Sequence, residues 1–221
     1  ADGIRLGSRR VRWRHHVRGN LGHYDLAVLS RALIKNYPEH YKIYAQRSFT
    51  WNNITQNNRN TLLWEDSSVD GIKTGHTNSA GYSLASSAVR NDFRVIAVVL
   101  GADSESYRQR VSRELLNYAF NNFDRKKIYS ANEKIQDLKV RRGVAETVAA
   151  GVRDEIVATL PRVQYENLKA QIRMEEPIMA PIKQGDEIAK LEFHIGDHQL
   201  YSFPVVALED VEQTGFFQRI W

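Results

Sequence analysis

Apolar residues recur at helical spacing near the start of the chain. In residues 24–35 (YDLAVLSRALIK), one face of a helix would carry Leu26, Leu29, Leu33 and Ile34. Asp25 lies in the first turn and Pro38 follows the end, which favours a helix with these limits. Residues 49–64 (FTWNNITQNNRNTLLW) are polar and rich in asparagine, and this pattern predicts short extended pieces joined by turns.

The next segments follow strand patterns. Residues 69–74, 82–89 and 93–101 predict three strands of an antiparallel sheet, the last two joined at Arg90-Asn91-Asp92. The run VIAVVL is apolar enough for a strand buried on both faces. Ser106 and Gln109 form a capping-box pattern. The helix that they would open keeps its apolar residues at helical spacing, namely Val111, Leu115, Tyr118, Ala119 and Phe123.

After about residue 128 the apolar spacing changes from helical to alternating. Short strand-like segments are separated by turn residues, and Gly196-Asp197 is a two-residue hairpin signal. The patterns therefore predict an α+β fold: a mixed helix and antiparallel-sheet domain at 23–127, then a small all-β, sandwich-like domain at 128–213. Residues 214–221 end in GFFQRIW, which resembles the first turn of an amphipathic membrane anchor.

Charge sets the first 22 residues apart. The chain of 221 residues has a formal charge of +5. Residues 1–20 contain six arginines and only one acidic residue, Asp2. A basic arm of this kind can bind nucleic acid or lipid headgroups, but we favour a segment at 1–22 that lies outside the core fold. The absence of cysteine excludes disulfides and a thiolate nucleophile, and no apolar run is long enough to span a bilayer.

One short motif carries chemistry. Lys73-Thr74-Gly75 ends a predicted strand and continues as His76-Thr77. A lone Lys-Thr-Gly is a weak signal. In serine penicillin-recognising enzymes, however, this triplet accompanies S-x-x-K, which holds the nucleophilic serine, and S-x-N.

Around this motif, a longer resemblance emerges. NRNTLLWEDSSVDGIKTGHTNSAGYSLASSAV, together with YDLAVLSRALI, YKIYAQRSFTWNNITQNNRN, VIAVVLGADS and the β-rich region with its FFxxI ending, is similar to low-molecular-weight penicillin-binding proteins. These proteins are serine-type D-alanyl-D-alanine carboxypeptidases. The resemblance covers about residues 23–221 and implies a partial penicillin-recognising domain followed by a β domain. The implied reaction removes the terminal D-alanine from peptidoglycan stem pentapeptides, with β-lactams as substrate mimics.

The resemblance also implies roles for individual residues. Lys73 would supply positive charge beside the reacting carbonyl, Thr74 would donate to the terminal carboxylate of the peptide, and Gly75 would leave the backbone accessible. The backbone N–H near His76 would form half of an oxyanion hole. Arg59 and Arg108 match family arginines that hold the site and the substrate carboxylate, although for each alone a surface ion pair is about as plausible.

The departures from the family are equally specific. No serine in the sequence has lysine three positions later, and the single S-x-N, at Ser130-Ala131-Asn132, suits a turn. We therefore expect a C-terminal portion of the family protein that is not acylated. We also expect no metal and no cofactor, because the histidines lack ligand spacing.

The same resemblance implies a location and partners. It places the parent protein in the periplasm, peripheral on the inner membrane, with stem peptide and β-lactams as ligands. Two other classes stay open: a non-catalytic cell-envelope protein that binds wall peptide or a partner, and a nucleic-acid-binding protein acting through residues 1–22. We expect no nucleic-acid partner, since no base-reading or stacking motif accompanies the arginines.

Overall fold

A computed structural model of the chain describes residues 22–215. The basic segment predicted at 1–22 and the anchor predicted at 214–221 therefore lie almost entirely outside the described residues. The described chain divides into two compact units, at 22–123 and 124–215. Among the helices of residues 22–215, none is both long and apolar enough to cross a membrane.

The N-terminal unit begins with helix α1 (His23–Asn36), which confirms the helix predicted at 24–35. Its first turn is held by Asp25, whose carboxylate accepts a hydrogen bond from the Gly22 backbone N–H at 2.9 Å. Helix α2 (Pro38–Tyr41) and the short 3-10 helix η1 (Lys42–Ala45) follow directly. Val28 and Leu29 of α1 remain exposed in the described structure.

A short hairpin comes next, as the polar pattern predicted. Strands β1 (Ser48–Trp51) and β2 (Ile54–Asn57) pair antiparallel, and the two asparagines between them adopt positive φ. Trp51 lies opposite Ile54 and is 75% exposed. The hairpin is therefore held by its ladder and its turn rather than by burial.

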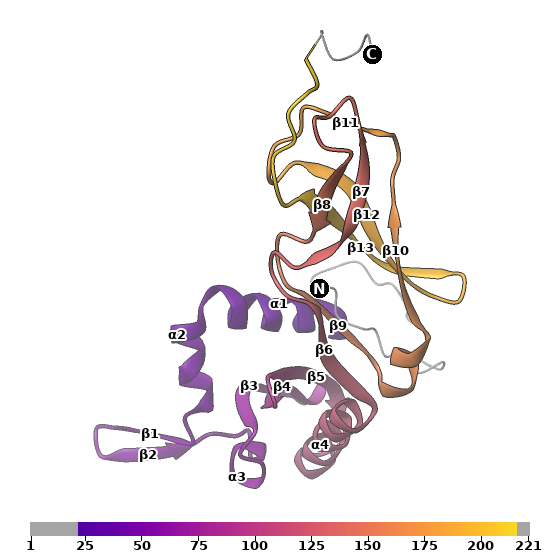
Figure 1. Ribbon diagram of the computed structural model, residues 1–221. Coiled ribbons are helices and arrows are strands. Elements are labelled where there is room, and N and C mark those ends of the chain that lie inside the picture. Colours follow the sequence, from indigo (N-terminus) through magenta and orange to yellow (C-terminus); the bar gives the residue numbers. More distant parts are fainter. Residues whose placement is uncertain (1–21, 216–221) are drawn as a thin grey trace. The chain divides into compact units, whose positions relative to one another are not determined.

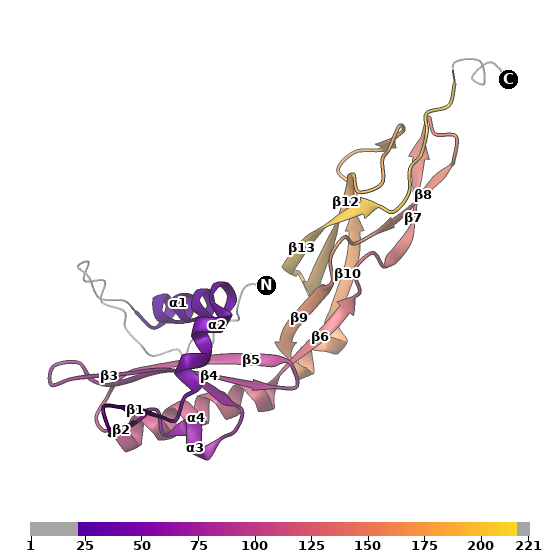
Figure 2. The ribbon, with the colours of Figure 1, turned by 90° about the vertical axis from the view of Figure 1, so that its left-hand side faces the viewer.

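A three-stranded antiparallel sheet forms the centre of this unit. Its order is β3 (Val69–Thr77), β4 (Gly81–Arg90) and β5 (Phe93–Ala102), and the short helix α3 (Leu62–Glu65) precedes it. The predicted hairpin is confirmed: Arg90 pairs with Phe93, and Asn91 and Asp92 both have positive φ, as a type I′ turn requires. Figure 2 shows α1 and α4 (Glu105–Asn122) on opposite faces of this sheet.

Helix α4 corrects two details of the prediction. Ser104, not Ser106, is the N-cap, because Ser104 has an extended backbone and its Oγ accepts from the Tyr107 N–H at 3.1 Å. The helix ends at Asn122, so Phe123 is the first residue of a strand. Leu115 and Tyr118 are exposed, and the buried stripe consists of Arg108, Ser112, Leu116, Ala119 and Phe120.

The core of this unit lies between α4 and one face of the sheet. It contains Leu62, Leu63, Val69, Leu84, Ala88, Ala97, Leu116 and Phe120. The run VIAVVL was predicted to be buried on both faces, but only Ala97 and Val99 within it are buried. Ile96 and Val98 alternate with them and are half-buried, because in the described residues α1 covers their face less fully.

The C-terminal unit is all β, as the alternating pattern predicted (Figure 1). Strands β6 (Phe123–Tyr129) and β9 (Ile156–Pro161) form a two-stranded sheet, and the 3-10 helix η2 (Arg162–Asn167) follows β9. A curled six-stranded sheet has the order β10-β12-β13-β8-β7-β11. Its strands are β7 (Lys134–Arg141), β8 (Thr147–Gly151), β10 (Leu168–Arg173), β11 (Ile178–Met179), β12 (Glu187–Ile195) and β13 (His198–Ala207).

Two local features fix this second unit. Ile195 pairs with His198, so Gly196-Asp197 is the predicted two-residue hairpin turn, and Gly196 has a φ of 57°. At Gly151 a Cβ would overlap the Glu133 carbonyl oxygen, so only glycine allows this close backbone approach. The core beneath includes Val148, Leu191, Phe193 and Val205, each no more than 1% exposed.

Candidate active site on strand β3

The Lys-Thr-Gly motif lies on an edge strand. Within residues 22–215, β3 pairs with β4 alone, and Lys73 lies opposite Ala85 in that ladder. Burial changes along the strand: Gly71 and Ile72 are buried, Thr74 is half-buried, and Lys73, Gly75 and His76 are exposed. The second half of β3 therefore offers backbone groups and a lysine side chain to an incoming molecule.

Lys73 folds back along its own strand. Its ammonium donates to the Thr74 carbonyl oxygen at 2.6 Å. The backbone alternation of a strand puts Lys73 and Gly75 on one face and Thr74 and His76 on the other. The motif thus places positive charge on one face of the strand and a hydroxyl on the opposite face.

His76 is supported by an aromatic neighbour. Its ring stacks on that of Tyr82, with centroids 4.0 Å apart and planes 30° from parallel. The guanidinium carbon of Arg108 lies 5.9 Å from the centroid of the Tyr82 ring. His76 and Tyr82 also line a polar hollow at this end of the sheet, together with Asn78, Ser79, Ala80, Gly81, Gly101, Ala102 and Asp103.

The structure brings the two predicted arginines together through a backbone atom. Arg108 is only 3% exposed, and its Nη2 donates to Glu105 Oε1 at 2.7 Å and to the Arg59 carbonyl oxygen at 3.3 Å. Arg59 itself is exposed. Arg108 therefore connects helix α4 to the turn before α3. Its guanidinium group also lies near the Tyr82 ring.

Residues that the sequence did not single out hold the start of β3. Asn60 is fully buried, and its side-chain N–H donates to the Gly71 carbonyl oxygen at 3.0 Å. On the next residue back, the Asp70 carboxylate accepts from the Tyr41 hydroxyl at 3.0 Å and pairs with Arg94 at 2.7 Å. In the sequence, Asn60 could have been found because it directly follows the candidate residue Arg59. Tyr41 lies 29 residues from Asp70, so no local sequence pattern pointed to it.

The pKa values of Tyr41 and Asp66 reflect the surroundings of these two side chains. Burial raises the pKa of Tyr41 above its ordinary range, so the phenol stays a hydrogen-bond donor. Burial alone would also raise the pKa of Asp66, but hydrogen bonds from the Ser68 hydroxyl, the Ser68 backbone and Arg90 outweigh it and hold that pKa below the usual value.

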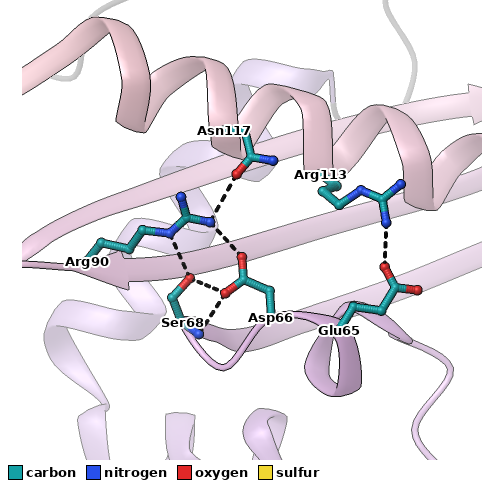
Figure 3. A network of polar contacts seen from close by, with 6 residues as sticks. All are labelled: Glu65, Asp66, Ser68, Arg90, Arg113 and Asn117. Carbon is teal, nitrogen blue, oxygen red and sulfur yellow. Dashed lines mark hydrogen bonds and ion pairs between the residues drawn. The ribbon is translucent and has the colours of Figure 1, made fainter.

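Asp66 belongs to a network on the α4 side of the sheet (Figure 3). Arg90 donates to Asp66 Oδ2 at 2.7 Å, to Ser68 Oγ at 3.1 Å and to Asn117 Oδ1 at 3.0 Å. A second ion pair joins α4 to α3, between Arg113 and Glu65 at 2.8 Å. The loop that leads into β3 is therefore anchored to α4 by charged hydrogen bonds.

The second motif of the family set is absent from this unit. Ser130-Ala131-Asn132 lies between β6 and β7, in the C-terminal unit, and Asn132 has a φ of 58°. The expected turn is confirmed. None of the serines in the sequence precedes a lysine by three positions. What the described site can offer chemically is an open strand edge, a cation and hydroxyl groups.

Comparison with known proteins agrees with this arrangement. Residues 16–104 match the family model described as D-alanyl-D-alanine carboxypeptidase, and residues 123–213 match penicillin-binding protein 5, C-terminal domain. The D-alanyl-D-alanine carboxypeptidase DacD of Escherichia coli K12 is 40% identical over 199 residues, which are 89% of this chain and 51% of that protein. The related DacF of Bacillus subtilis is 30% identical over 203 residues, covering 87% and 51%.

A solved structure gives the same result. Penicillin binding protein 5 from Haemophilus influenzae superposes with a TM-score of 0.75 at 34% identity, covering 86% of this chain and 56% of that one. The fold and these comparisons thus define part of an α+β domain of the penicillin-recognising fold, followed by a C-terminal β domain. The chain belongs to the low-molecular-weight penicillin-binding proteins of the D-alanyl-D-alanine carboxypeptidase family, and it spans about half the length of the curated relatives it matches.

Proposed function

We propose that this chain carries the Lys-Thr-Gly side of a D-alanyl-D-alanine carboxypeptidase site. In that role it binds the D-Ala-D-Ala end of a peptidoglycan stem peptide along the open edge of β3. The observation that carries the proposal is the exposure of Lys73, Gly75 and His76 on a strand that pairs on one side only within residues 22–215. An extended peptide can add to such an edge through backbone hydrogen bonds.

Each motif residue has a task in this complex. The Lys73 ammonium attracts the peptide's carboxylate and developing negative charge, an effect that grows where water is excluded. Thr74 donates its hydroxyl to the terminal carboxylate, and Gly75 keeps side-chain atoms away from the peptide. The backbone N–H at His76 lies on the same strand, so it can point at the carbonyl that reacts. Arg59, being exposed, is available to the carboxylate; Arg108 supports the site through Tyr82.

Removal of the terminal D-alanine through a serine acyl intermediate also requires a nucleophile. The 221 residues contain no S-x-x-K, so we infer that they bind without being acylated. Intact-mass spectrometry after incubation with a penicillin, beside a complete family member as positive control, tests this inference. We expect no adduct on this chain. A mass increase of one drug molecule would show that one of its serines acts as the nucleophile.

Binding has a separate test. We would titrate the ¹⁵N-labelled chain with a peptide ending in D-Ala-D-Ala and follow the amide signals of residues 72–77. The matched control is the same peptide ending in L-Ala-L-Ala. We expect shifts confined to β3 and its neighbours with the D-peptide alone. Equal responses to both peptides, or shifts elsewhere, would contradict the proposal.

The open strand edge and exposed Lys73 also fit a second candidate, a non-catalytic cell-envelope protein that binds wall peptide or a partner without turnover. This candidate predicts that the chain binds stem peptide and that no D-alanine is released, even when a second polypeptide carrying S-x-x-K is added. In both cases we place the protein in the periplasm, because the family acts on the bacterial cell wall. Peripheral attachment to the inner membrane through residues 214–221 belongs to the same proposal.

A further inference from the structure

Side chains from other elements hold strand β3 at two consecutive residues, Asp70 and Gly71, shortly before its exposed half begins. Tyr41 and Arg94 hold the side chain of Asp70, and Asn60 holds the backbone of Gly71. Two residues later the Lys-Thr-Gly motif begins. The outer edge of β3 therefore changes from anchored to accessible within a single strand, while its inner edge stays paired with β4.

The first anchor comes from the short helix α2. Tyr41 is 5% exposed, and its hydroxyl reaches Asp70 Oδ1 at 3.0 Å. It also lies directly against Gly71, since a Cβ placed there would be 2.6 Å from the Tyr41 hydroxyl oxygen. Glycine at this position is what lets the phenol approach the strand.

Arg94 completes this first anchor from β5. Its Nη1 donates to Asp70 Oδ1 at 2.9 Å and to the buried Ser87 hydroxyl at 2.6 Å. Its guanidinium carbon lies 5.5 Å from the Tyr41 ring centroid. The Asp70 carboxylate is thereby held by partners from two other elements, which fixes the strand in more than one direction.

The second anchor comes from the turn before α3. Asn60 is 0% exposed, so the hydrogen bond from its amide to the Gly71 carbonyl is protected from water. Its backbone N–H donates to Asn58 Oδ1 at 2.9 Å, which fixes the turn itself. The preceding carbonyl, of Arg59, accepts from Arg108 of α4. Asn60 thus connects the position of α4 to the backbone of β3.

We propose that Tyr41 and Asn60 are positioning residues for the Lys-Thr-Gly edge: they hold residues 70 and 71 so that the outer edge of β3 from Lys73 onward keeps the line and register that an added peptide strand needs. This inference rests on the proposed function for its purpose. Its structural content, the local holding of β3, can be measured without any ligand.

The experiment compares two variants with two matched controls. Tyr41→Phe removes the hydroxyl and keeps the ring, and its control, Tyr165→Phe, removes a hydroxyl that bonds two carbonyls in the C-terminal unit. Asn60→Ala removes an amide donor to a carbonyl, and its control, Asn122→Ala, does the same at the exposed end of α4. Amide hydrogen exchange of the 221-residue chain gives residue-level protection in every variant.

Exchange separates positioning from general stability. In the Tyr41 and Asn60 variants we expect exchange at residues 72–77 to become about tenfold faster, as the loss of one buried hydrogen bond predicts. Leu116 and neighbouring amides of α4 should stay within twofold of the parent. Both controls should leave residues 72–77 unchanged. Uniform acceleration across residues 22–123, or no change at 72–77, would overturn the proposal.

Peptide binding provides the second readout. If the parent chain binds the D-Ala-D-Ala peptide, the Tyr41 and Asn60 variants should weaken binding at least fivefold while the controls do not. If the parent chain fails to bind while the exchange result holds, the proposed function falls and the positioning of β3 stands. Unchanged exchange beside normal parent binding would reject the positioning inference alone.

Discussion

The imidazole of His76 stacks on the phenol ring of Tyr82 across one rung of the β3–β4 ladder, with 4.0 Å between ring centroids. Tyr82 in turn lies near the guanidinium of the buried Arg108. The residue that follows Lys-Thr-Gly is thus connected to the last helix of the unit by two ring contacts. This connection gives His76 a defined orientation although it is exposed.

Replacement of Tyr82 by leucine removes this stacking and keeps apolar bulk. We expect the N-terminal unit to lose about 0.5–1.5 kcal/mol of unfolding free energy, the usual worth of an aromatic pair. Urea unfolding followed through amide signals of β4 and β5 measures the loss. The His76→Ala variant should lose a similar amount, and the double variant should lose less than the sum. Additive losses would show that the two rings do not interact.

The Lys73 side chain should matter to binding and not to folding. Lys73→Ala removes an exposed ammonium whose hydrogen bond is to its own strand, so the unfolding free energy should change by less than about 0.5 kcal/mol. Affinity for a D-Ala-D-Ala peptide should fall about tenfold and lose part of its salt dependence. Titration at two ionic strengths checks both effects. An unchanged affinity would remove Lys73 from the proposed site.

Acid should weaken the network around Asp66. Its folded pKa lies below the ordinary value, so the ionised carboxylate contributes stability above the unfolded pKa near 4, and this contribution is lost as pH falls through the folded pKa. Unfolding of the N-terminal unit, followed between about pH 6 and pH 2, should therefore show a decline that is smaller in Asp66→Asn. Parallel pH profiles for the two proteins would contradict this assignment.

Leu116 tests the core beneath the sheet. Its side chain is 1% exposed, between α4 and the sheet. Leu116→Ala should cost about 2–5 kcal/mol, because a cavity adds to the lost burial. Leu115→Ala, one residue earlier and on the exposed side of α4, is the control and should cost less than about 1 kcal/mol. Similar losses at both positions would mean that the helix presents a different face to the sheet.

Gly151 tests the C-terminal unit separately. An added methyl group would meet the Glu133 carbonyl oxygen and Leu208, so Gly151→Ala should cost about 1–3 kcal/mol. Gly215→Ala, where nothing lies within 4 Å, is the control. Amide signals of residues 124–215 should report the destabilisation, and those of 22–123 should not. A loss in both units would show that they unfold together.

Local chemistry determined which of these elements the sequence could predict. The hairpins at Asn91-Asp92 and Gly196-Asp197 follow from residues that accept positive φ, and α1 follows from its spacing and from Asp25. The N-cap of α4 was predicted at Ser106 because Gln109, three residues later, completes a capping-box pattern there, whereas Ser104 is followed by Tyr107 at that position. The extended backbone of Ser104, and the hydrogen bond that its Oγ accepts from the Tyr107 N–H, identify Ser104 as the N-cap instead.

Contacts between distant residues could not be predicted in the same way. The Lys-Thr-Gly motif is contiguous, so its residues were found in the sequence. The residues that hold β3 are brought to it from three other elements: Tyr41 from α2, Asn60 from a turn and Arg94 from β5. Hydrogen bonds of this kind depend on the packed arrangement, and a single sequence does not display them.

The open edge of β3 also affects how copies of the protein meet. A strand that can accept a peptide can equally accept the same strand of another copy, which is the first step toward aggregation. Antiparallel pairing of two such edges, centred on the motif, would bring two Lys73 ammonium groups together, and like charges oppose that pairing. If the edge binds peptide as proposed, the Lys73 charge would favour a carboxylate-bearing peptide over a second copy of the same edge.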